Sequence, residues 1–100
     1  MNELKQLPTL VYFSAPWCGP CRAMGPVVEQ ITGKLNIGVQ KINVDDEPEL
    51  AEKYGVRSIP TLVLEDRENG SKELLRIVGA KPAATLELEL TKVLVPAESP

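Results

Sequence analysis

The chain carries two cysteines, Cys18 and Cys21, at the junction between a strand-like segment and a helix-like segment. The segment before them, Thr9–Phe13, is rich in β-branched and aromatic residues and predicts a buried strand. After Cys18, apolar residues recur at the spacing of an amphipathic helix, at Met24, Val27, Val28, Ile31 and Leu35. The two thiols are therefore expected at a strand-to-helix turn, which limits the chain to folds that contain such a unit.

The middle of the chain predicts a second strand and a short helix. Residues Val39–Val44 alternate apolar and polar side chains, as a half-buried strand does. Pro48 fits the first turn of a helix that Asp46 can cap, and Gly55 is suited to end that helix in a left-handed conformation.

The remaining sequence predicts a hairpin and a final helix. Two strands, Thr61–Leu64 and Glu73–Val78, flank a turn that contains Asn69 and Gly70. Pro82 then opens a helix whose apolar stripe consists of Leu86, Leu90, Val93 and Leu94. The last residues, 96–100, are expected to form a disordered tail.

The order of these elements, β-α-β-α-β-β-α, predicts one α/β domain over residues 1–100. The first two strands are joined through a helix, so they are expected to be parallel with a right-handed crossover. The last two strands are joined by a turn, so they are expected to be antiparallel. The result is a mixed four-stranded sheet with helices on both faces, and the wholly apolar first strand is expected at its centre.

The composition argues against several classes of function. The 100 residues include 43% hydrophobic and 25% charged side chains, which is typical of a single globular domain. A net charge of −3 without a cluster of lysines or arginines argues against nucleic-acid binding. No apolar run approaches the roughly 20 residues that span a bilayer, and no signal-peptide pattern is present. We therefore expect a cytoplasmic protein without nucleic-acid or membrane partners.

Metal binding and structural bonding are both weak interpretations of the cysteine pair. A structural zinc site needs four ligands, but the chain has two cysteines and no histidine, so a shared zinc or iron–sulfur site would need two protomers. A structural disulfide would close a loop of only four residues, from Cys18 to Cys21, which stabilises by roughly 2 kcal/mol on the chain-entropy model. A reducing cytoplasm would also tend to break it.

Redox exchange is the favoured interpretation. A cysteine at the start of a helix lies near free backbone N–H groups and the positive end of the helix dipole, which stabilise a thiolate. A thiolate is the species that attacks a disulfide. Cys21 lies one turn further along, close enough to Cys18 to attack a mixed disulfide formed there. The spacing thus supplies an attacking and a resolving thiol in one helical turn.

Several dispersed segments resemble the thioredoxin family, from about Pro8 to Leu94. Beside Cys18-Gly-Pro-Cys21 with its preceding Trp17, the resemblance rests on Phe13, Pro26, residues 41–45, residues 54–61 and residues 78–80. It implies the thioredoxin fold, with Cys18 as the attacking thiol and Cys21 as the resolving thiol.

The resemblance also implies roles for residues around the cysteines. Pro60 matches a cis-proline that faces the pair, and the Ile59 backbone would then be free to bind an extended substrate like an added strand. A shallow apolar patch around Cys18 would consist of Trp17, Gly19, Pro20, Ile59, Gly79 and Ala80. Pro26 would kink the helix, and Lys41 matches a lysine behind the cysteines that can support proton transfer. Asp45 and Asp46 are expected to cap a helix and remain solvated.

Two departures from the family pattern affect mechanism and fold. The family usually has a buried aspartate where this chain has Tyr12, and a tyrosine with a pKa near 10 is a poor base at neutral pH. We expect Tyr12 to pack in the core, with Cys21 deprotonated by water or with help from Lys41. Ser14 is a smaller departure, because many relatives have an aromatic residue there.

The second departure is a short N-terminus, in which Asn2–Gln6 could form at most about one helical turn. We therefore expect four strands instead of five, without the usual N-terminal strand. The edge beside Val39–Val44 would be exposed, so the expected monomer could dimerise weakly there.

The function implied by the resemblance is reduction of protein disulfides. The partners would be disulfide-containing proteins and either thioredoxin reductase or another dithiol donor. No bound cofactor is expected, since the Cys18–Cys21 disulfide is itself the redox group, and no metal site is assigned. The alternatives are a non-enzymatic adaptor or metal and cluster carrier with the same fold, and an isomerase or oxidase.

Overall fold

The computed structural model describes residues 8–68 and 70–94, and its elements follow the predicted order. These elements are β1 (Thr9–Ser14), α1 (Gly19–Leu35), β2 (Gly38–Asn43), α2 (Pro48–Lys53), β3 (Thr61–Asp66), β4 (Lys72–Val78) and α3 (Ala83–Leu94). The predictions for Asn2–Gln6, Asn69 and residues 96–100 lie outside the described residues. No helix in the described ranges is long and apolar enough to cross a membrane.

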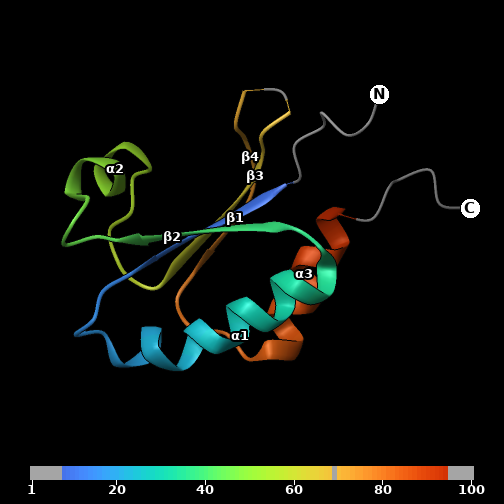
Figure 1. The fold of residues 1–100 in the computed structure, drawn as a ribbon, viewed down its shortest axis with the longest axis horizontal. Coiled ribbons are helices and arrows are strands. Elements are labelled where there is room, and N and C mark those ends of the chain that lie inside the picture. Colours follow the sequence, from blue (N-terminus) through green and yellow to red (C-terminus); the bar gives the residue numbers. More distant parts are fainter. Residues whose placement is uncertain (1–7, 69, 95–100) are drawn as a thin grey trace, which may run out of the picture.

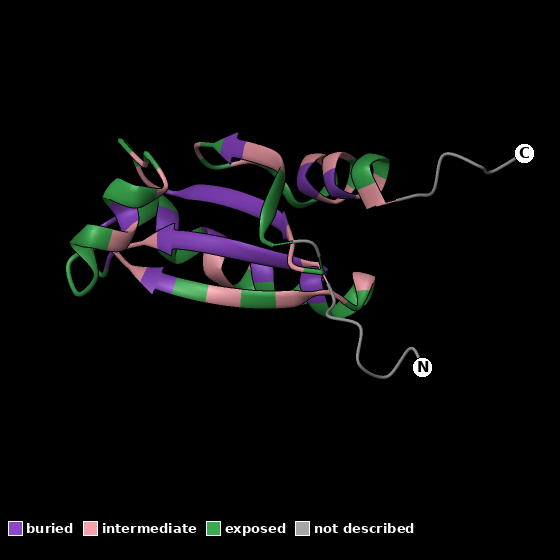
Figure 2. Ribbon diagram, turned by 90° about the horizontal axis from the view of Figure 1, so that it is seen from above, coloured by how far each residue is buried: buried purple, intermediate pink, exposed green. Residues whose placement is uncertain are grey.

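The strands form one four-stranded sheet in the order β2-β1-β3-β4, as Figure 1 shows. β1 runs parallel to β2 and antiparallel to β3, and β3 runs antiparallel to β4, so the predicted mixed sheet is confirmed. The two central strands are buried along nearly their whole length, whereas β2 and β4 are mostly half-buried or exposed, with one buried residue each (Figure 2). The predicted central place of the first strand is also confirmed.

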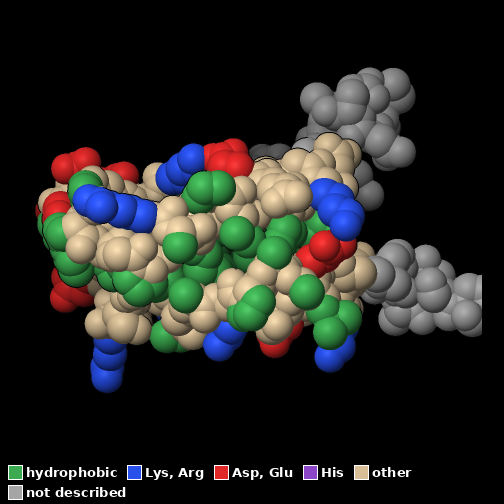
Figure 3. Space-filling view, turned by 90° about the horizontal axis from the view of Figure 1, so that it is seen from below, with side chains coloured by type: hydrophobic (Ala, Val, Ile, Leu, Met, Phe, Trp, Pro, Cys, Tyr) green, Lys and Arg blue, Asp and Glu red, His purple; other side chains and the backbone are tan. Residues whose placement is uncertain are grey.

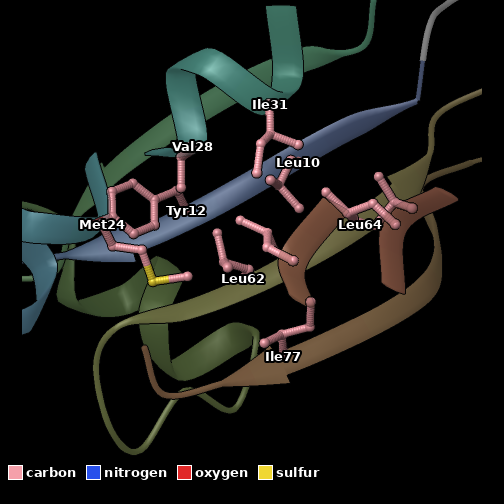
Figure 4. Packing of buried hydrophobic residues seen from close by; sticks show 10 residues of the cluster. Leu10, Tyr12, Met24, Val28, Ile31, Leu62, Leu64 and Ile77 are labelled. Carbon is pink, nitrogen blue, oxygen red and sulfur yellow. The ribbon is translucent and has the colours of Figure 1, made fainter. Parts of the chain in front are cut away.

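Helices cover both faces of this sheet. α1 and α3 pack side by side on one face and α2 lies on the other (Figure 1). The larger core lies under α1 and α3, where Tyr12 of β1 packs with Met24 and Val28 of α1 (Figure 4). The smaller core lies under α2 and contains Phe13 and Ile42. Both cores therefore rest on β1, because alternate residues of one strand face opposite sides of a sheet.

The outer surface of α1 and α3 carries hydrophobic side chains between charged ones, as the space-filling view in Figure 3 shows. Lys34 of α1 and Glu87 of α3 form an ion pair of 2.8 Å that links the two helices. Val93 was expected in the buried stripe of α3, but 37% of its surface is exposed. Leu86 and Leu90 alone are fully buried in that helix, since they face the sheet.

Some element boundaries differ from the predicted ones by one or two residues. β3 continues past Leu64 to Asp66, because the buried carboxylate of Glu65 accepts hydrogen bonds from Tyr54 (2.5 Å) and Arg67 (3.0 Å). α3 begins at Ala83, and the carbonyl of Pro82 accepts the first helical hydrogen bond, from Leu86.

The predicted cap of α2 is wrong. The N-cap is Glu47 instead of Asp46, and its side chain makes no capping hydrogen bond. The end of the helix is as predicted, since Gly55 follows the C-cap with a φ of 70°.

Candidate active site

The two cysteines lie where β1 turns into α1, at one end of the sheet (Figure 1). Cys18 is the N-cap of α1, one position before the helix begins, and Pro20 lies in the first turn. The backbone N–H of Cys21 donates a hydrogen bond of 3.2 Å to the Cys18 sulfur. A helix of 17 residues thus points its positive end, and one aligned N–H group, at this sulfur.

Cys18 and Cys21 are joined by a disulfide, with their Cα atoms 5.2 Å apart, so the structure describes the oxidised form. Both residues are buried, Cys18 at 6% exposure and Cys21 at 4%, and they pack with Ala15 against Val44 and Ile59. Because so little of Cys18 is exposed, a substrate can reach it only past the side chains that surround it.

Two further segments meet the disulfide. The Ile59–Pro60 peptide bond is cis, and the Ile59 carbonyl oxygen lies 4.0 Å from the Cys18 sulfur. The N–H of Gly79 donates a 2.8 Å hydrogen bond to the Pro60 carbonyl, which holds the end of β4 beside this loop. Gly79 has a φ of 94°, a conformation that favours glycine. The structure therefore brings three of the predicted segments together.

The residues predicted to form the apolar patch are at the surface. Trp17, Gly19, Pro20 and Ala80 are exposed, while Ile59 and Gly79 are half-buried. Trp17 has 67% of its surface exposed, so it is not a core residue.

The indole N–H of Trp17 donates a 2.8 Å hydrogen bond to the carboxylate of Asp45. Asp45 was expected to cap a helix. It is exposed as predicted, but it anchors the tryptophan instead, and the residues themselves gave no signal for this contact across 28 positions.

A groove of about 350 Å³ begins beside the cysteines. Its lining residues come from the turn before α1, from α2 and the turns on either side of it, and from the loop before the cis bond, and they are Trp17, Val44, Ala51, Val56, Arg57, Ser58 and Ile59. Most of these side chains are apolar, and Arg57 adds a positive charge at the surface. Sequence reasoning identified Trp17 and Ile59 but missed the rest, because the groove exists only once α2 is packed on the sheet.

A second pocket, of about 290 Å³, lies on the other side of Cys21, between the start of α1 and the ends of β1 and β2. It is lined by Tyr12, Ser14, Ala15, Pro16, Cys21, Arg22, Gly25, Lys41 and Asn43. The register of the parallel pair, with Tyr12 opposite Lys41 and Ser14 opposite Asn43, places these polar residues on one face.

Tyr12 is buried at 3% exposure, as predicted, and its hydroxyl donates a 2.6 Å hydrogen bond to the Cys21 carbonyl. Burial raises the pKa of this hydroxyl above its ordinary value of 10.0, and the nearby Ser14 hydroxyl opposes the shift only in part. Tyr12 therefore stays protonated at neutral pH and acts as a hydrogen-bond donor.

Lys41 lies in the wall of the same pocket, and its side chain is 54% exposed. Its ammonium group forms an ion pair with the carboxylate of Glu29 on α1. Pro26 lies inside α1, which continues past it to Leu35. Within residues 8–68 and 70–94, no group of three or more histidine, cysteine, aspartate or glutamate side chains is arranged to hold a metal ion.

Comparisons with known proteins agree on one family. A family model described as Thioredoxin matches residues 2–92. The thioredoxin of Porphyra purpurea is 48% identical over 88 residues, which cover 86% of this chain and 79% of that protein. The thioredoxin of a Synechocystis strain is 45% identical over 91 residues, covering 89% of this chain and 82% of that protein. A solved mutant thioredoxin from Halobacterium salinarum has a TM-score of 0.80 and 36% identity, and the match covers 91% of this chain and 80% of that one.

Proposed function

The chain belongs to the thioredoxin family of disulfide reductases, and we propose that it reduces protein disulfides through Cys18 and Cys21. The observation that carries this proposal is the place of Cys18 at the N-cap of α1, with the Cys21 N–H aimed at its sulfur. An N–H donor and the positive end of a helix both favour a thiolate over a thiol. Cys18 is therefore the attacking residue.

The first step is attack of the Cys18 thiolate on a substrate disulfide. A bond forms between Cys18 and one substrate sulfur, the substrate S–S bond breaks, and the other substrate sulfur leaves as a thiolate that takes a proton from water. Cys18 accounts for this step because it is the sulfur at the helix start and contacts the loop at Ile59.

The second step is attack of the Cys21 thiolate on the Cys18 sulfur. The Cys18–Cys21 disulfide forms, the mixed disulfide breaks, and the second substrate sulfur is released, so two electrons have passed to the substrate. The Cα separation of 5.2 Å and the bonded form of the pair support this geometry. A reductase or another dithiol donor must then reduce the pair, since no bound cofactor is proposed.

Substrates are proposed to bind in an extended conformation across the cis loop. The Ile59 backbone lies outside the sheet and beside the Cys18 sulfur, so it is placed to pair with a substrate segment as an added strand does. Trp17, Gly79 and Ala80 would contact the flanking side chains, and the groove beside Trp17 offers space for an apolar one. We place this activity in the cytoplasm, where free thiols are kept reduced.

The test is a turnover assay of insulin disulfide reduction with dithiothreitol as the electron donor. The protein should accelerate reduction in catalytic amounts, and Cys18→Ser should lose this acceleration completely. Cys21→Ser should lose turnover but retain a single attack by Cys18. An absence of acceleration that depends on Cys18 would contradict the proposal and favour a binding role for the same fold.

A further inference from the structure

The pocket beside Cys21 is a feature of the site that the two exchange steps do not use. It opens to solvent and reaches the resolving cysteine from the side opposite the groove, with a volume of about 290 Å³. One water molecule takes about 30 Å³ in the liquid, so the pocket has room for several. Its walls include a hydroxyl, an amide and two cationic side chains, from Ser14, Asn43, Arg22 and Lys41. A polar pocket of this size is suited to hold water.

Cys21 must lose a proton before it can attack, and the side chains around it are poor acceptors. The hydroxyl of Tyr12, from β1, donates a hydrogen bond to the Cys21 carbonyl and is protonated. Lys41, from β2, and Arg22, from α1, are cations, and Lys41 is paired with Glu29. Cys21 also packs with Ala15, Val44 and Ile59, which do not titrate. Among the described residues that line the pocket, none is a carboxylate.

The small side chain of Ser14 helps to keep this pocket open. Ser14 lies at the end of β1, opposite Asn43 of β2, and is half-buried in the pocket wall. A large apolar side chain at this position would project into the space between β1 and α1 and take the place of water next to Cys21. A thiolate without water in an apolar setting is costly, and this raises the pKa of a thiol.

We propose that this pocket is the proton exit of the resolving thiol, and that Ser14 is a positioning residue that keeps water beside Cys21. The inference rests on the proposed role of Cys21 in resolution. The Cys21 S–H bond breaks, its proton passes to water in the pocket and from there to bulk solvent, and the electron pair stays on sulfur. That thiolate then attacks Cys18, and the departing substrate thiolate takes a proton from solvent. The positive charges of Lys41 and Arg22 favour the thiolate and disfavour retention of the proton.

The test compares Ser14→Phe and Ser14→Leu, which fill the pocket, with Ser14→Ala, which removes the hydroxyl and leaves the space. Resolution of a preformed mixed disulfide on Cys18 is followed by stopped flow at neutral pH. A rise of about one unit in the pKa of Cys21 lowers its thiolate fraction about tenfold, so both large variants should resolve about tenfold more slowly. Ser14→Ala should stay within about twofold, and the rate of the first attack by Cys18 should be unchanged in all three.

A second measurement does not depend on turnover. In a Cys18→Ala background, Cys21 is the only thiol, and its alkylation by iodoacetamide is measured across pH with and without Ser14→Phe or Ser14→Leu. The midpoint should move upward by about one unit with either large side chain and stay in place with Ser14→Ala. Equal midpoints in folded variants, or equal resolution rates, would overturn the proton exit. Failure of the wild-type protein to reduce insulin would overturn the proposed function instead, and the alkylation profile would still decide whether the pocket serves Cys21.

Discussion

Tyr12 joins the central strand to the first turn of α1 through one hydrogen bond, from its hydroxyl to the Cys21 carbonyl. The ring packs among Met24 and Val28, so the hydroxyl is held at the base of the site (Figure 4). A buried donor with this geometry fixes the backbone of Cys21, the proposed resolving cysteine. Tyr12 therefore contributes to the stability of the fold and to the position of the Cys21 backbone. Removal of its hydroxyl should affect stability without changing the rate of disulfide exchange.

Tyr12→Phe should lower the free energy of unfolding by about 1 kcal/mol, because the ring remains and one buried hydrogen bond is lost. The rate of mixed-disulfide resolution should change by less than about twofold, since the hydroxyl is not the base. Urea denaturation measures the first quantity and stopped-flow kinetics the second. A large loss of resolution rate at unchanged stability would show that the Tyr12 proton is used in the reaction.

Two tyrosines, the buried Tyr12 and the half-buried Tyr54, should make the protein sensitive to alkaline pH. Burial raises the pKa of Tyr12, and burial together with the neighbouring Glu65 carboxylate raises the pKa of Tyr54. Because the folded pKa of each lies above the unfolded value near 10, the folded state retains protons that the unfolded state loses. Stability is thus fully present below about pH 10 and falls as the pH rises through the folded pKa values.

Denaturation measured between pH 8 and pH 12 should show this decline, and Tyr12→Phe should make it less steep. Tyr12→Phe removes one tyrosine hydroxyl and no lysine, so a difference between the two proteins reports on Tyr12. A decline of the same steepness in the variant and the wild-type protein would contradict the assignment to Tyr12.

At the scale of elements, one hydrogen bond holds the turn before α1 against the turn before α2. The Trp17 indole donates to Asp45 at 2.8 Å, and Trp17 forms one wall of the groove beside the cysteines. The bond therefore sets the position of a large exposed side chain where protein substrates are proposed to bind. The chain has a single tryptophan, so its fluorescence reports directly on this contact.

Asp45→Ala should raise the KM for a protein disulfide about fivefold, the equivalent of about 1 kcal/mol for a lost hydrogen bond. The kcat and the rate with a small disulfide should remain unchanged, because the cysteines are not touched. Asp45→Asn keeps an acceptor oxygen and should stay near the wild-type KM. Equal KM values for all three proteins would show that the Trp17 position does not matter for substrate binding.

Local patterns predicted which elements form, and long-range contacts decided where some of them end. The apolar run before the cysteines and the helical spacing after them were sufficient to predict β1 and α1. β3 extends through Glu65 because Glu65 and Asp66 still pair with Glu73 and Lys72 of β4, and Tyr54, eleven positions earlier in the chain, helps to satisfy the buried carboxylate of Glu65. Asp46 was a reasonable cap by residue type, but the turn before α2 places Glu47 at that position.

At the scale of the whole molecule, the site is assembled from segments that the sheet topology brings together. The resemblance of Pro60 and residues 78–80 to family motifs anticipated their place beside the cysteines. The Trp17–Asp45 bond and the pocket beside Cys21 could not be anticipated, since both depend on the register of β1 with β2 and on the packing of α1 and α2. The family and the segments that meet the cysteines were thus predictable from the sequence, whereas the contacts that depend on strand register and helix packing were not.

A substitution in the core under α3 should lower the stability of the fold without changing the activity of the redox site. Leu90 is fully buried there, so Leu90→Ala should lower the free energy of unfolding by about 2–5 kcal/mol. Leu88 lies on the same helix with 57% of its surface exposed, and Leu88→Ala should cost less than about 0.5 kcal/mol. Under conditions where both variants are folded, their rates of insulin reduction should match the wild-type rate. A redox defect in folded Leu90→Ala would show that α3 is coupled to the site.

The central claim is that Cys18 attacks and Cys21 resolves. Its most direct test is intact-mass spectrometry of serine variants after incubation with a disulfide substrate. Cys21→Ser should accumulate a stable mixed disulfide on Cys18, because attack proceeds and resolution is lost. Cys18→Ser should accumulate little adduct, since the N-cap position and the aligned N–H group belong to residue 18. A stable adduct on Cys21 in the Cys18→Ser variant, with none on Cys18 in the Cys21→Ser variant, would contradict the account.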